Sequence, residues 1–166
     1  MKAGDAGFLI REATVDDAQG IASVHVTAWQ ETYGPLLPEG ALNDLDVDAR
    51  ASRWAEIIGG GKTILVAEDA PVIVAWATEG TGRDDDVPVA RELEGIYALT
   101  RVHGSGVGQQ LLDASIGDEP AYLWIPDGND RAEAFYRRNG FRRDGAEREH
   151  LLAGHPRTTV RMVRGS

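Results

Sequence analysis

The chain has 166 residues, of which 27 are acidic and 17 are lysine or arginine, so its net charge at pH 7 is −10. This length suits one domain with a normal hydrophobic core. The acidic balance argues against a nucleic-acid-binding protein, which needs a basic face. The chain has no cysteine, which excludes disulfides, thiolate metal ligands and a cysteine acyl-enzyme.

By default we expect a cytoplasmic protein. No apolar run approaches the ~20 residues that cross a membrane. Residues 1–7 lack the charged and apolar blocks of a signal peptide. We therefore expect no membrane partner, and a single domain over residues 1–166 whose ends, 1–7 and 164–166, are flexible.

Eleven elements are predicted, in the order strand, helix, helix, three strands, helix, strand, helix and two strands. Thr14 and Asp48 are the expected N-caps of the first two helices, and the turn at Asp69-Ala70-Pro71 makes an antiparallel hairpin. Helices are expected over 15–31, 49–58, from the glycine-rich loop to about 116, and from 129 to 139. Strands are expected over 8–11, 63–68, 72–78, 91–99, 121–125, 141–147 and 158–163.

The most informative segment runs from Leu93 to Leu112. It reads as a buried strand, then glycines at three alternate positions, Gly104, Gly106 and Gly108, and then the start of an amphipathic helix. Glycines let the backbone curl tightly and let an anion approach its N–H groups. The helix adds unpaired N–H groups and the positive end of its dipole. The segment predicts a site for a phosphate or pyrophosphate, and so a nucleotide-bearing cofactor.

Two common phosphate-binding designs fit this loop poorly. A P-loop needs Lys-Ser or Lys-Thr directly after the glycines, but the chain's only Lys-Thr pair, Lys62-Thr63, opens a strand. A dinucleotide-binding loop needs Gly-x-Gly-x-x-Gly, and Gln109 stands where the third glycine belongs. A glycine turn that only joins a strand to a helix is the structural alternative.

A second motif runs from Asn129 to Phe141. Asn129 or Asp130 can cap a short helix, and Asp130 with Glu133 has the spacing of a capping box. Gly140 is a typical C-terminal stop. One face of this helix carries apolar and aromatic side chains at helical spacing: Ala132, Phe135 and Tyr136.

Together the two motifs resemble the GNAT-type N-acetyltransferase superfamily. The loop His103-Gly104-Ser105-Gly106-Val107-Gly108 resembles the family's Arg/Gln-x-x-Gly-x-Gly/Ala loop, departing from it at His103, and Arg101 could supply the missing charge. The helix matches Asn-x-x-Ala-x-x-Phe-Tyr-x-x-x-Gly-Phe at every named position. The resemblance implies an α/β (α+β) fold, a mixed central sheet of about seven strands flanked by helices in the order βααβββαβαββ.

The resemblance also implies a coenzyme site for acetyl-CoA. In the family the loop amides hold the pyrophosphate, the pantetheine arm pairs with the strand before the loop, and Asn129 matches the position that contacts this arm. A strand amide near Tyr97 or Ala98 can stabilise the thioester oxygen. The cofactor-binding residues so implied are Ile96, Tyr97, Ala98, His103, Gly104, Ser105, Gly106, Val107, Gly108, Gln109, Asn129 and Tyr136.

Catalytic residues follow from the same comparison. Tyr136 matches the family's general acid, which protonates the leaving thiolate, and its structural alternative is a core tyrosine. Glu92 and Glu94 are candidates for the base, acting directly or through water, or else are plain strand carboxylates. Weaker candidates for the base are Glu31, His25 and Tyr33.

The sequence says less about the residues that bind the acceptor amine. The segment from Trp29 to Pro38 resembles a subgroup of small acetyltransferases in which this region walls the acceptor pocket, so Trp29 and Tyr33 are the expected substrate-binding residues. The run Asp84–Asp86 either attracts a cationic amine or is a solvated loop. Histidines at 25, 103, 150 and 155 have no metal-ligand spacing, so no metal is expected.

The resulting hypothesis is an N-acetyltransferase that moves an acetyl group from acetyl-CoA to a primary amine of a small molecule or peptide, directly and in a ternary complex. One alternative is a non-catalytic acyl-CoA sensor with the same cofactor site. Another is a nucleotide-binding oxidoreductase, which Gln109 disfavours. Family members often form homodimers, so a second copy of the chain is a further expected partner.

Overall fold

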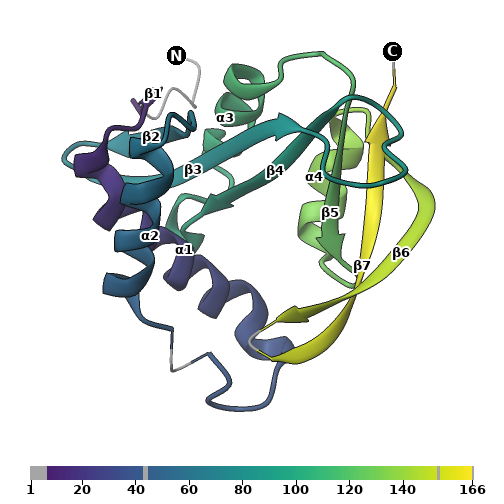
Figure 1. The fold of residues 1–166 in the computed structure, drawn as a ribbon, viewed down its shortest axis with the longest axis horizontal. Coiled ribbons are helices and arrows are strands. Elements are labelled where there is room, and N and C mark those ends of the chain that lie inside the picture. The colour runs from purple at the N-terminus through teal and green to yellow at the C-terminus, as the bar shows by residue number, and fades with distance from the viewer. Residues whose placement is uncertain (1–6, 43–44, 153, 166) are drawn as a thin grey trace. The chain divides into compact units, whose positions relative to one another are not determined.

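The structure is a computed structural model that describes residues 7–42, 45–152 and 154–165. Over these residues the elements follow the order βααβββαβαββ, as predicted (Figure 1). The strands are β1 (Leu9–Glu12), β2 (Leu65–Asp69), β3 (Val72–Thr81), β4 (Arg91–Ala98), β5 (Ala121–Pro126), β6 (Arg142–Leu152) and β7 (His155–Arg164). The helices are α1 (Ala18–Tyr33), α2 (Val47–Gly59), α3 (Val107–Ser115) and α4 (Asp130–Arg138).

The strands of the described residues form one mixed sheet in the order β1-β2-β3-β4-β5-β7-β6. β4 and β5 are parallel, with Glu92 opposite Tyr122. The other pairings whose register is defined, β1–β2, β2–β3, β5–β7 and β6–β7, are antiparallel. The predicted α/β fold with a mixed seven-stranded sheet is therefore confirmed.

The last hairpin is longer than predicted. β6 was expected to end at Glu147, yet it pairs with β7 as far as Leu152 opposite His155. This outer part carries almost only exposed side chains, so it has no apolar alternation for a sequence pattern to detect. Arg164 was expected to be a flexible end, but it closes β7 and its guanidinium donates to the carbonyl oxygens of Gly117, Glu119 and Asn139. Residues 1–6 and 166 of the expected flexible ends lie outside the described residues.

The cap of α2 also differs from the prediction. Asp46, in extended conformation, accepts hydrogen bonds from the N–H groups of Asp48 at 2.9 Å and Ala49 at 3.2 Å. Asp48 instead lies in the first turn, where its charge favours the helix dipole. Two neighbouring aspartates can both serve as caps in sequence terms, and the local backbone decides between them. Thr14 caps a short 3₁₀ turn, Val15–Asp17, that leads into α1.

The chain divides into two compact units. Unit 1 comprises residues up to Thr78 together with Ile96–Ser115, and unit 2 comprises Glu79–Gly95 together with the residues from Ile116 onward. Unit 1 thus holds α1, α2, α3, β1 and β2, with most of β3 and the end of β4. Unit 2 holds α4 and β5 to β7, with the end of β3 and the start of β4. The single domain over 1–166 stays a prediction.

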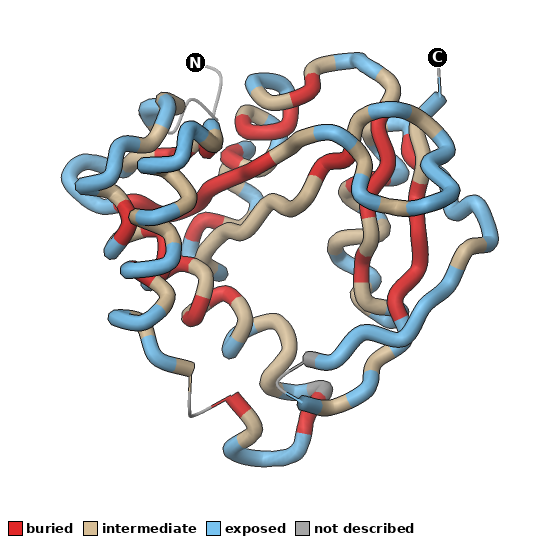
Figure 2. The backbone as a smooth tube through the Cα atoms, in the orientation of Figure 1, coloured by how far each residue is buried: buried red, intermediate tan, exposed pale blue. Residues whose placement is uncertain are grey.

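The core of unit 1 fixes the glycine-rich loop at both of its ends. Val102 before the loop and Val107 after it are buried with Leu111 against Val74 and Ala75 of β3. This central part of β3 is buried almost throughout (Figure 2). Burial of these aliphatic side chains stabilises the segment on both sides of the loop, so the loop between them is held by packing and not only by its own hydrogen bonds.

Unit 2 contains a buried charge network around Arg161 of β7. The side chain of Arg161 is 7% exposed, and its nitrogens lie 3.0 Å from Asp84, 3.0 Å from Asp86 and 2.6 Å from Asp144. Asp84 is buried too. Several well-made charge-assisted hydrogen bonds offset the cost of taking these groups out of water. The network ties the loop between β3 and β4 to β6 and β7.

Replacing Arg161 with methionine is expected to lower the free energy of unfolding by roughly 3–5 kcal/mol, because the buried carboxylate of Asp84 loses its buried partner. Urea unfolding measured by circular dichroism tests this. Arg137→Met is the matched control, since Arg137 is largely exposed and pairs with Glu133 within α4, so its loss should cost about 0.5 kcal/mol or less. Equal effects of the two substitutions would show that the Arg161 network adds nothing to stability.

Candidate active site

The glycine-rich loop of unit 1 has the backbone that its sequence predicts. Gly104 and Gly106 have φ values of +78° and +90°, a region that L-residues with a Cβ rarely adopt. The Ser105 hydroxyl donates to the carbonyl oxygen of Val102 and accepts from the N–H of Val107 at 3.3 Å. α3 begins at Val107, so the N–H groups of its first turn have no acceptor within the helix. Such a loop and helix end can bind an anion.

The residues before the loop do not bring a free cation to it. Arg101 lies 3.5 Å from Asp69 and is exposed, so its charge is paired with a carboxylate on the β2–β3 turn. The His103 ring nitrogen Nε2 lies 3.3 Å from the carbonyl oxygen of Ala98. A short 3₁₀ turn, Thr100–Val102, joins β4 to the loop, and the N–H of His103 donates to Thr100 at 3.0 Å. His103 therefore links the end of β4 to the start of the loop.

The end of β4 carries the predicted pantetheine-pairing residues. Ile96, Tyr97 and Ala98 are half-buried and belong to unit 1. Ile96 and Ala98 pack against one core cluster of this unit and Tyr97 against another. Because alternate residues of a strand face opposite ways, Ile96 and Ala98 share one face and Tyr97 takes the other.

The second motif forms α4 in unit 2. Asn129 is its N-cap, and its side-chain oxygen accepts from the N–H of Ala132 at 3.3 Å. The predicted capping box is wrong, because the Glu133 carboxylate instead binds Arg137 and Arg143. These hydrogen bonds, that of Arg143 first, lower the pKa of Glu133. Asn129 thus supplies the cap alone.

Tyr136 is buried, with 6% of its surface exposed. Its ring centroid lies 5.1 Å from that of Phe135 and 5.6 Å from that of Phe141. Both pairs are edge-to-face, an arrangement that aromatic rings favour. The ring is therefore held firmly in unit 2, which is consistent both with a core residue and with a precisely positioned acid.

Glu92 is nearly fully buried in unit 2, with 2% of its surface exposed. Arg83 binds both carboxylate oxygens, at 2.9 and 2.8 Å, and also donates its backbone N–H at 3.1 Å. The Tyr122 hydroxyl donates to the same carboxylate at 3.3 Å, and burial raises the pKa of Tyr122. Glu92 is thus the acceptor at the centre of a closed hydrogen-bond network, and Glu94 lies 3.9 Å from the same Arg83 side chain.

The sequence predicts that the run Asp84–Asp86 either attracts a cationic amine or is solvated, and Asp84 fits neither prediction. Its carboxylate accepts from Trp124 Nε1 at 2.9 Å and also binds Arg148 and Arg161. It is neither solvated nor free to attract a cationic amine. The pKa of Asp86 is lowered, chiefly by its hydrogen bond with Arg161. A charge count along the sequence cannot detect these arginines, which come from β6 and β7.

On the acceptor side, Trp29 and Tyr33 are in contact on α1, with ring centroids 5.6 Å apart. Trp29 also contacts His25 one turn earlier, at 5.1 Å. Burial, and then the charge of Arg50, lower the pKa of His25 to about 4, so its imidazole is neutral at neutral pH. His25, Trp29 and Tyr33 therefore lie together in unit 1.

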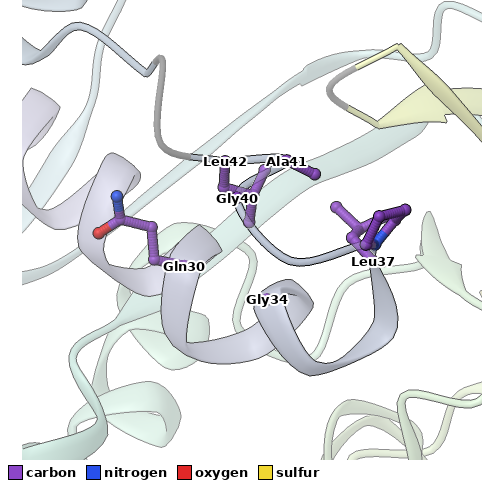
Figure 3. Close-up of a pocket in the computed structure, with 7 residues that line it drawn as sticks. Gln30, Gly34, Leu37, Gly40, Ala41 and Leu42 are labelled. Atoms are coloured by element: carbon purple, nitrogen blue, oxygen red, sulfur yellow. The ribbon is translucent and has the colours of Figure 1, made fainter.

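A pocket of about 300 Å³ lies at the C-terminal end of α1 (Figure 3). It is lined by Gln30, Gly34, Leu37, Pro38, Gly40, Ala41 and Leu42. The sequence predicts that the segment from Trp29 to Pro38 lies beside the acceptor, but it does not mark Gly40, Ala41 and Leu42 as pocket residues. Small residues around a turn carry no pattern that would mark them as pocket residues.

The predicted site residues are divided between the two units. Unit 1 holds the glycine-rich loop, Ile96 to Ala98, Trp29 and Tyr33, and unit 2 holds Glu92, Glu94, Asn129 and Tyr136. Within residues 7–42, 45–152 and 154–165 no cluster of three or more metal-ligating side chains occurs. No helix among the same residues is long and apolar enough to span a membrane.

Comparison with known proteins gives the class of enzyme, an N-acetyltransferase, and identifies the family. Residues 60–143 match the family model of the acetyltransferase (GNAT) domain. The uncharacterized N-acetyltransferase Rv2669 of Mycobacterium tuberculosis is 30% identical over 156 residues, which are 89% of this chain and 97% of that protein. The uncharacterized N-acetyltransferase YuaI of Bacillus subtilis is 28% identical over 127 residues, 72% of each chain. The chain therefore belongs to the GNAT acetyltransferase family.

Solved structures agree on the fold. The ribosomal-protein-alanine N-acetyltransferase of Brucella melitensis matches with a TM-score of 0.71 and 23% identity over 95% of this chain and 99% of that one. The acetyltransferase YncA of Salmonella typhimurium, solved with acetyl-CoA, matches with a TM-score of 0.68 and 20% identity over 96% and 94%. The PaiA N-acetyltransferase of Thermoplasma acidophilum, solved with coenzyme A, has a TM-score of 0.67 and 16% identity over 96% and 99%.

Proposed function

We propose that this enzyme transfers the acetyl group of acetyl-CoA directly to a primary amine of a small molecule or peptide. The observation that carries the proposal is the glycine-rich loop, which leads into α3 with two glycines at positive φ. Relatives that share the fold were solved with coenzyme A or acetyl-CoA, which supports the same co-substrate here. The absence of cysteine supports direct transfer, because no thiol can carry the acetyl group as an enzyme intermediate.

In this proposal the coenzyme is held mainly by backbone. The N–H groups of the loop glycines and of the first turn of α3 donate to the pyrophosphate, whereas the N–H groups of His103 and Ser105 already donate to Thr100 and Val102. The pantetheine arm pairs with the backbone of Ile96 and Ala98, and Asn129 donates its side-chain amide to the same arm. The cap hydrogen bond uses only the Asn129 side-chain oxygen, so its amide nitrogen can still donate to a ligand.

The chemical step then needs an oxyanion donor, an acid and a route for the amine proton. The amine nitrogen attacks the thioester carbon, the C–N bond forms, and the N–H of Tyr97 or Ala98 stabilises the developing oxyanion. The C–S bond then breaks, and Tyr136 gives its hydroxyl proton to the thiolate. The proton lost by the amine leaves through water or Glu94, since the oxygens of Glu92 already accept from Arg83 and Tyr122.

Glu92→Gln is therefore expected to destabilise the protein more than it slows the reaction. The substitution breaks the ion pair between the buried Glu92 carboxylate and the largely exposed Arg83 side chain, which costs about 1–3 kcal/mol. Thermal unfolding and kcat, measured on the same preparation below its unfolding temperature, separate the two effects. A kcat that falls about 100-fold or more in a protein of unchanged stability would make Glu92 the general base.

Calorimetry with acetyl-CoA, and with NAD for comparison, tests the cofactor assignment. We expect acetyl-CoA to bind and NAD to show no heat of binding. Amine-dependent release of the free thiol of coenzyme A then separates an enzyme from a sensor: a sensor binds acetyl-CoA and releases no thiol with any amine. Binding of NAD in place of acetyl-CoA would overturn the proposal.

A further inference from the structure

His25 lies at the centre of an aromatic cluster within unit 1. Its ring centroid is 5.1 Å from that of Trp29, 6.0 Å from Trp54, 5.5 Å from Trp76 and 5.2 Å from Tyr97. These five residues, which we call the aromatic cluster, come from α1, α2, β3 and β4. Trp76 also contacts Tyr97 at 4.7 Å, so the cluster reaches the β4 segment to which the proposed function assigns the thioester.

The aromatic cluster contains three ring nitrogens that are buried and have no hydrogen-bond partner: His25 Nδ1, Trp29 Nε1 and Trp76 Nε1. An indole nitrogen can only donate, and buried polar groups are normally paired. Trp76 is 2% exposed as a whole residue. An aromatic ring without an N–H group would pack here without an unpaired donor, so the two indole N–H groups indicate a partner that accepts hydrogen bonds.

The charge around the cluster favours an anion as that partner. The guanidinium of Arg50, on α2, lies 5.5 Å from the centre of the Trp29 ring. Its positive charge is also felt at His25, where it contributes to lowering the pKa. Because the His25 imidazole is neutral, the charge that we identify beside the aromatic cluster is the guanidinium of Arg50. Two indole donors beside a guanidinium match the acceptor oxygens and the charge of a carboxylate.

Part of the aromatic cluster is exposed at the surface of unit 1. Trp29, Trp54 and Tyr97 are half-buried, whereas the three unpaired nitrogens are buried. A ligand oxygen can meet the indole donors once a half-buried ring turns, while the remaining ring faces pack against an apolar side chain. The indoles would then exchange unpaired donors for hydrogen bonds, which favours binding.

We propose that the aromatic cluster and Arg50 bind the carboxylate of the acceptor, so that the acceptor amines of this enzyme are amino acids that carry a free carboxylate. This inference rests on the proposed function, since it names the substrate class of the same reaction. In it Trp29 Nε1 and Trp76 Nε1 donate to the carboxylate oxygens, and Arg50 compensates their charge. Because Tyr97 of the aromatic cluster belongs to β4, the amine of the same molecule is then placed near β4.

Paired acceptors test the inference: phenylalanine with phenethylamine, leucine with isopentylamine, and lysine with cadaverine. Each pair differs only in the carboxylate. With acetyl-CoA present, kcat/KM for the better amino acids should exceed that of their paired amines by about 10-fold or more, as expected for a charge-assisted contact. Amino acid amides form a third arm, which separates a carboxylate from a peptide carbonyl.

Two variants assign the preference to the cluster. Arg50→Met and Trp76→Phe should each reduce, by about 10-fold, the ratio of kcat/KM for an amino acid to kcat/KM for its paired amine. Arg53→Met is the matched control, because Arg53 is an exposed arginine of the same helix, and it should leave the preference unchanged. Equal rates for the two members of every pair, or a preference that survives both variants, would overturn the inference and leave the proposed function intact.

A binding measurement tests the proposed carboxylate site even if no amine is acetylated. Trp29, Trp54 and Trp76 are three of the four tryptophans in the chain, so carboxylate binding should change the intrinsic fluorescence. Saturable changes with phenylalanine or leucine, absent with their amines and lost in Arg50→Met, would support the site while the proposed function fails. No fluorescence change with any amino acid, together with no turnover, would contradict both.

Discussion

Tyr136→Phe is expected to reduce turnover with acetyl-CoA by about 10²–10⁴-fold, the range over which a positioned general acid contributes. The hydroxyl is lost, but the ring keeps its edge-to-face contacts with Phe135 and Phe141. The affinity for acetyl-CoA should therefore stay nearly the same. Steady-state kcat and a calorimetric Kd, measured on the same protein, check the two halves of this prediction.

Tyr122→Phe is the control for loss of a buried tyrosine hydroxyl from unit 2. Tyr122 donates to Glu92 and accepts from the N–H of Asp84, so we expect this variant to lose stability, by about 1–3 kcal/mol for the groups left unpaired. Its kcat below the unfolding temperature should fall far less than that of Tyr136→Phe. Unchanged turnover in Tyr136→Phe would remove Tyr136 from the mechanism and leave it as a core residue.

Gly106→Ala is expected to weaken acetyl-CoA binding by about 10-fold or more. A Cβ at φ of +90° costs roughly 1–2 kcal/mol per residue in the left-handed region, and the loop escapes that cost by changing shape. Space is not the obstacle, because nothing lies within 4 Å of the added Cβ. A reshaped loop no longer directs its N–H groups at the pyrophosphate, and the calorimetric Kd reports this directly.

Gly61→Ala provides the matched control. Gly61, which follows α2, has φ of +101° and open space around its Cβ as well, so the substitution imposes similar strain outside the loop. It should lower stability by a similar amount and leave the Kd for acetyl-CoA unchanged. If both variants bind acetyl-CoA with the affinity of the unmodified enzyme, the backbone of the loop is not the phosphate site.

The elements could be predicted from the sequence because their signals are local. Periodic apolar residues, the caps at Thr14 and Asn129 and the stop at Gly140 all act within a few residues. The errors occur where the signal is not local. The outer part of β6 is held by pairing with β7 rather than by an apolar pattern, and Asp46 and Asp48 compete for one cap on equal chemical terms.

The candidate site was predictable to the extent that it depends on backbone. The glycine spacing predicts a loop followed by a helix, although the third glycine, Gly108, lies within α3 and only Gly104 and Gly106 have positive φ. The environments of the carboxylates do not. Arg83, which occupies Glu92, is nine residues away in the chain, and Arg161, which occupies Asp84, is 77 residues away. Only the folded chain shows that these acids are already paired.

The aromatic cluster could be predicted from the sequence only in part. The family resemblance marked Trp29 and Tyr33 as substrate-binding residues and His25 as a weaker candidate for the base. Trp54 and Trp76 come from other elements, and their contacts with His25 depend on how α1, α2 and β3 pack in unit 1. The unpaired ring nitrogens become visible only in that packing, and they give the acceptor side a specific chemistry.

Amine-dependent thiol release from acetyl-CoA, with the product identified by mass spectrometry, tests the proposed reaction most directly. The proposal predicts one free coenzyme A and one N-acetylated amine for each acetyl-CoA consumed, with amino acids as the preferred acceptors. Tight binding of acetyl-CoA without thiol release, across amino acids, simple amines and peptides, would contradict it.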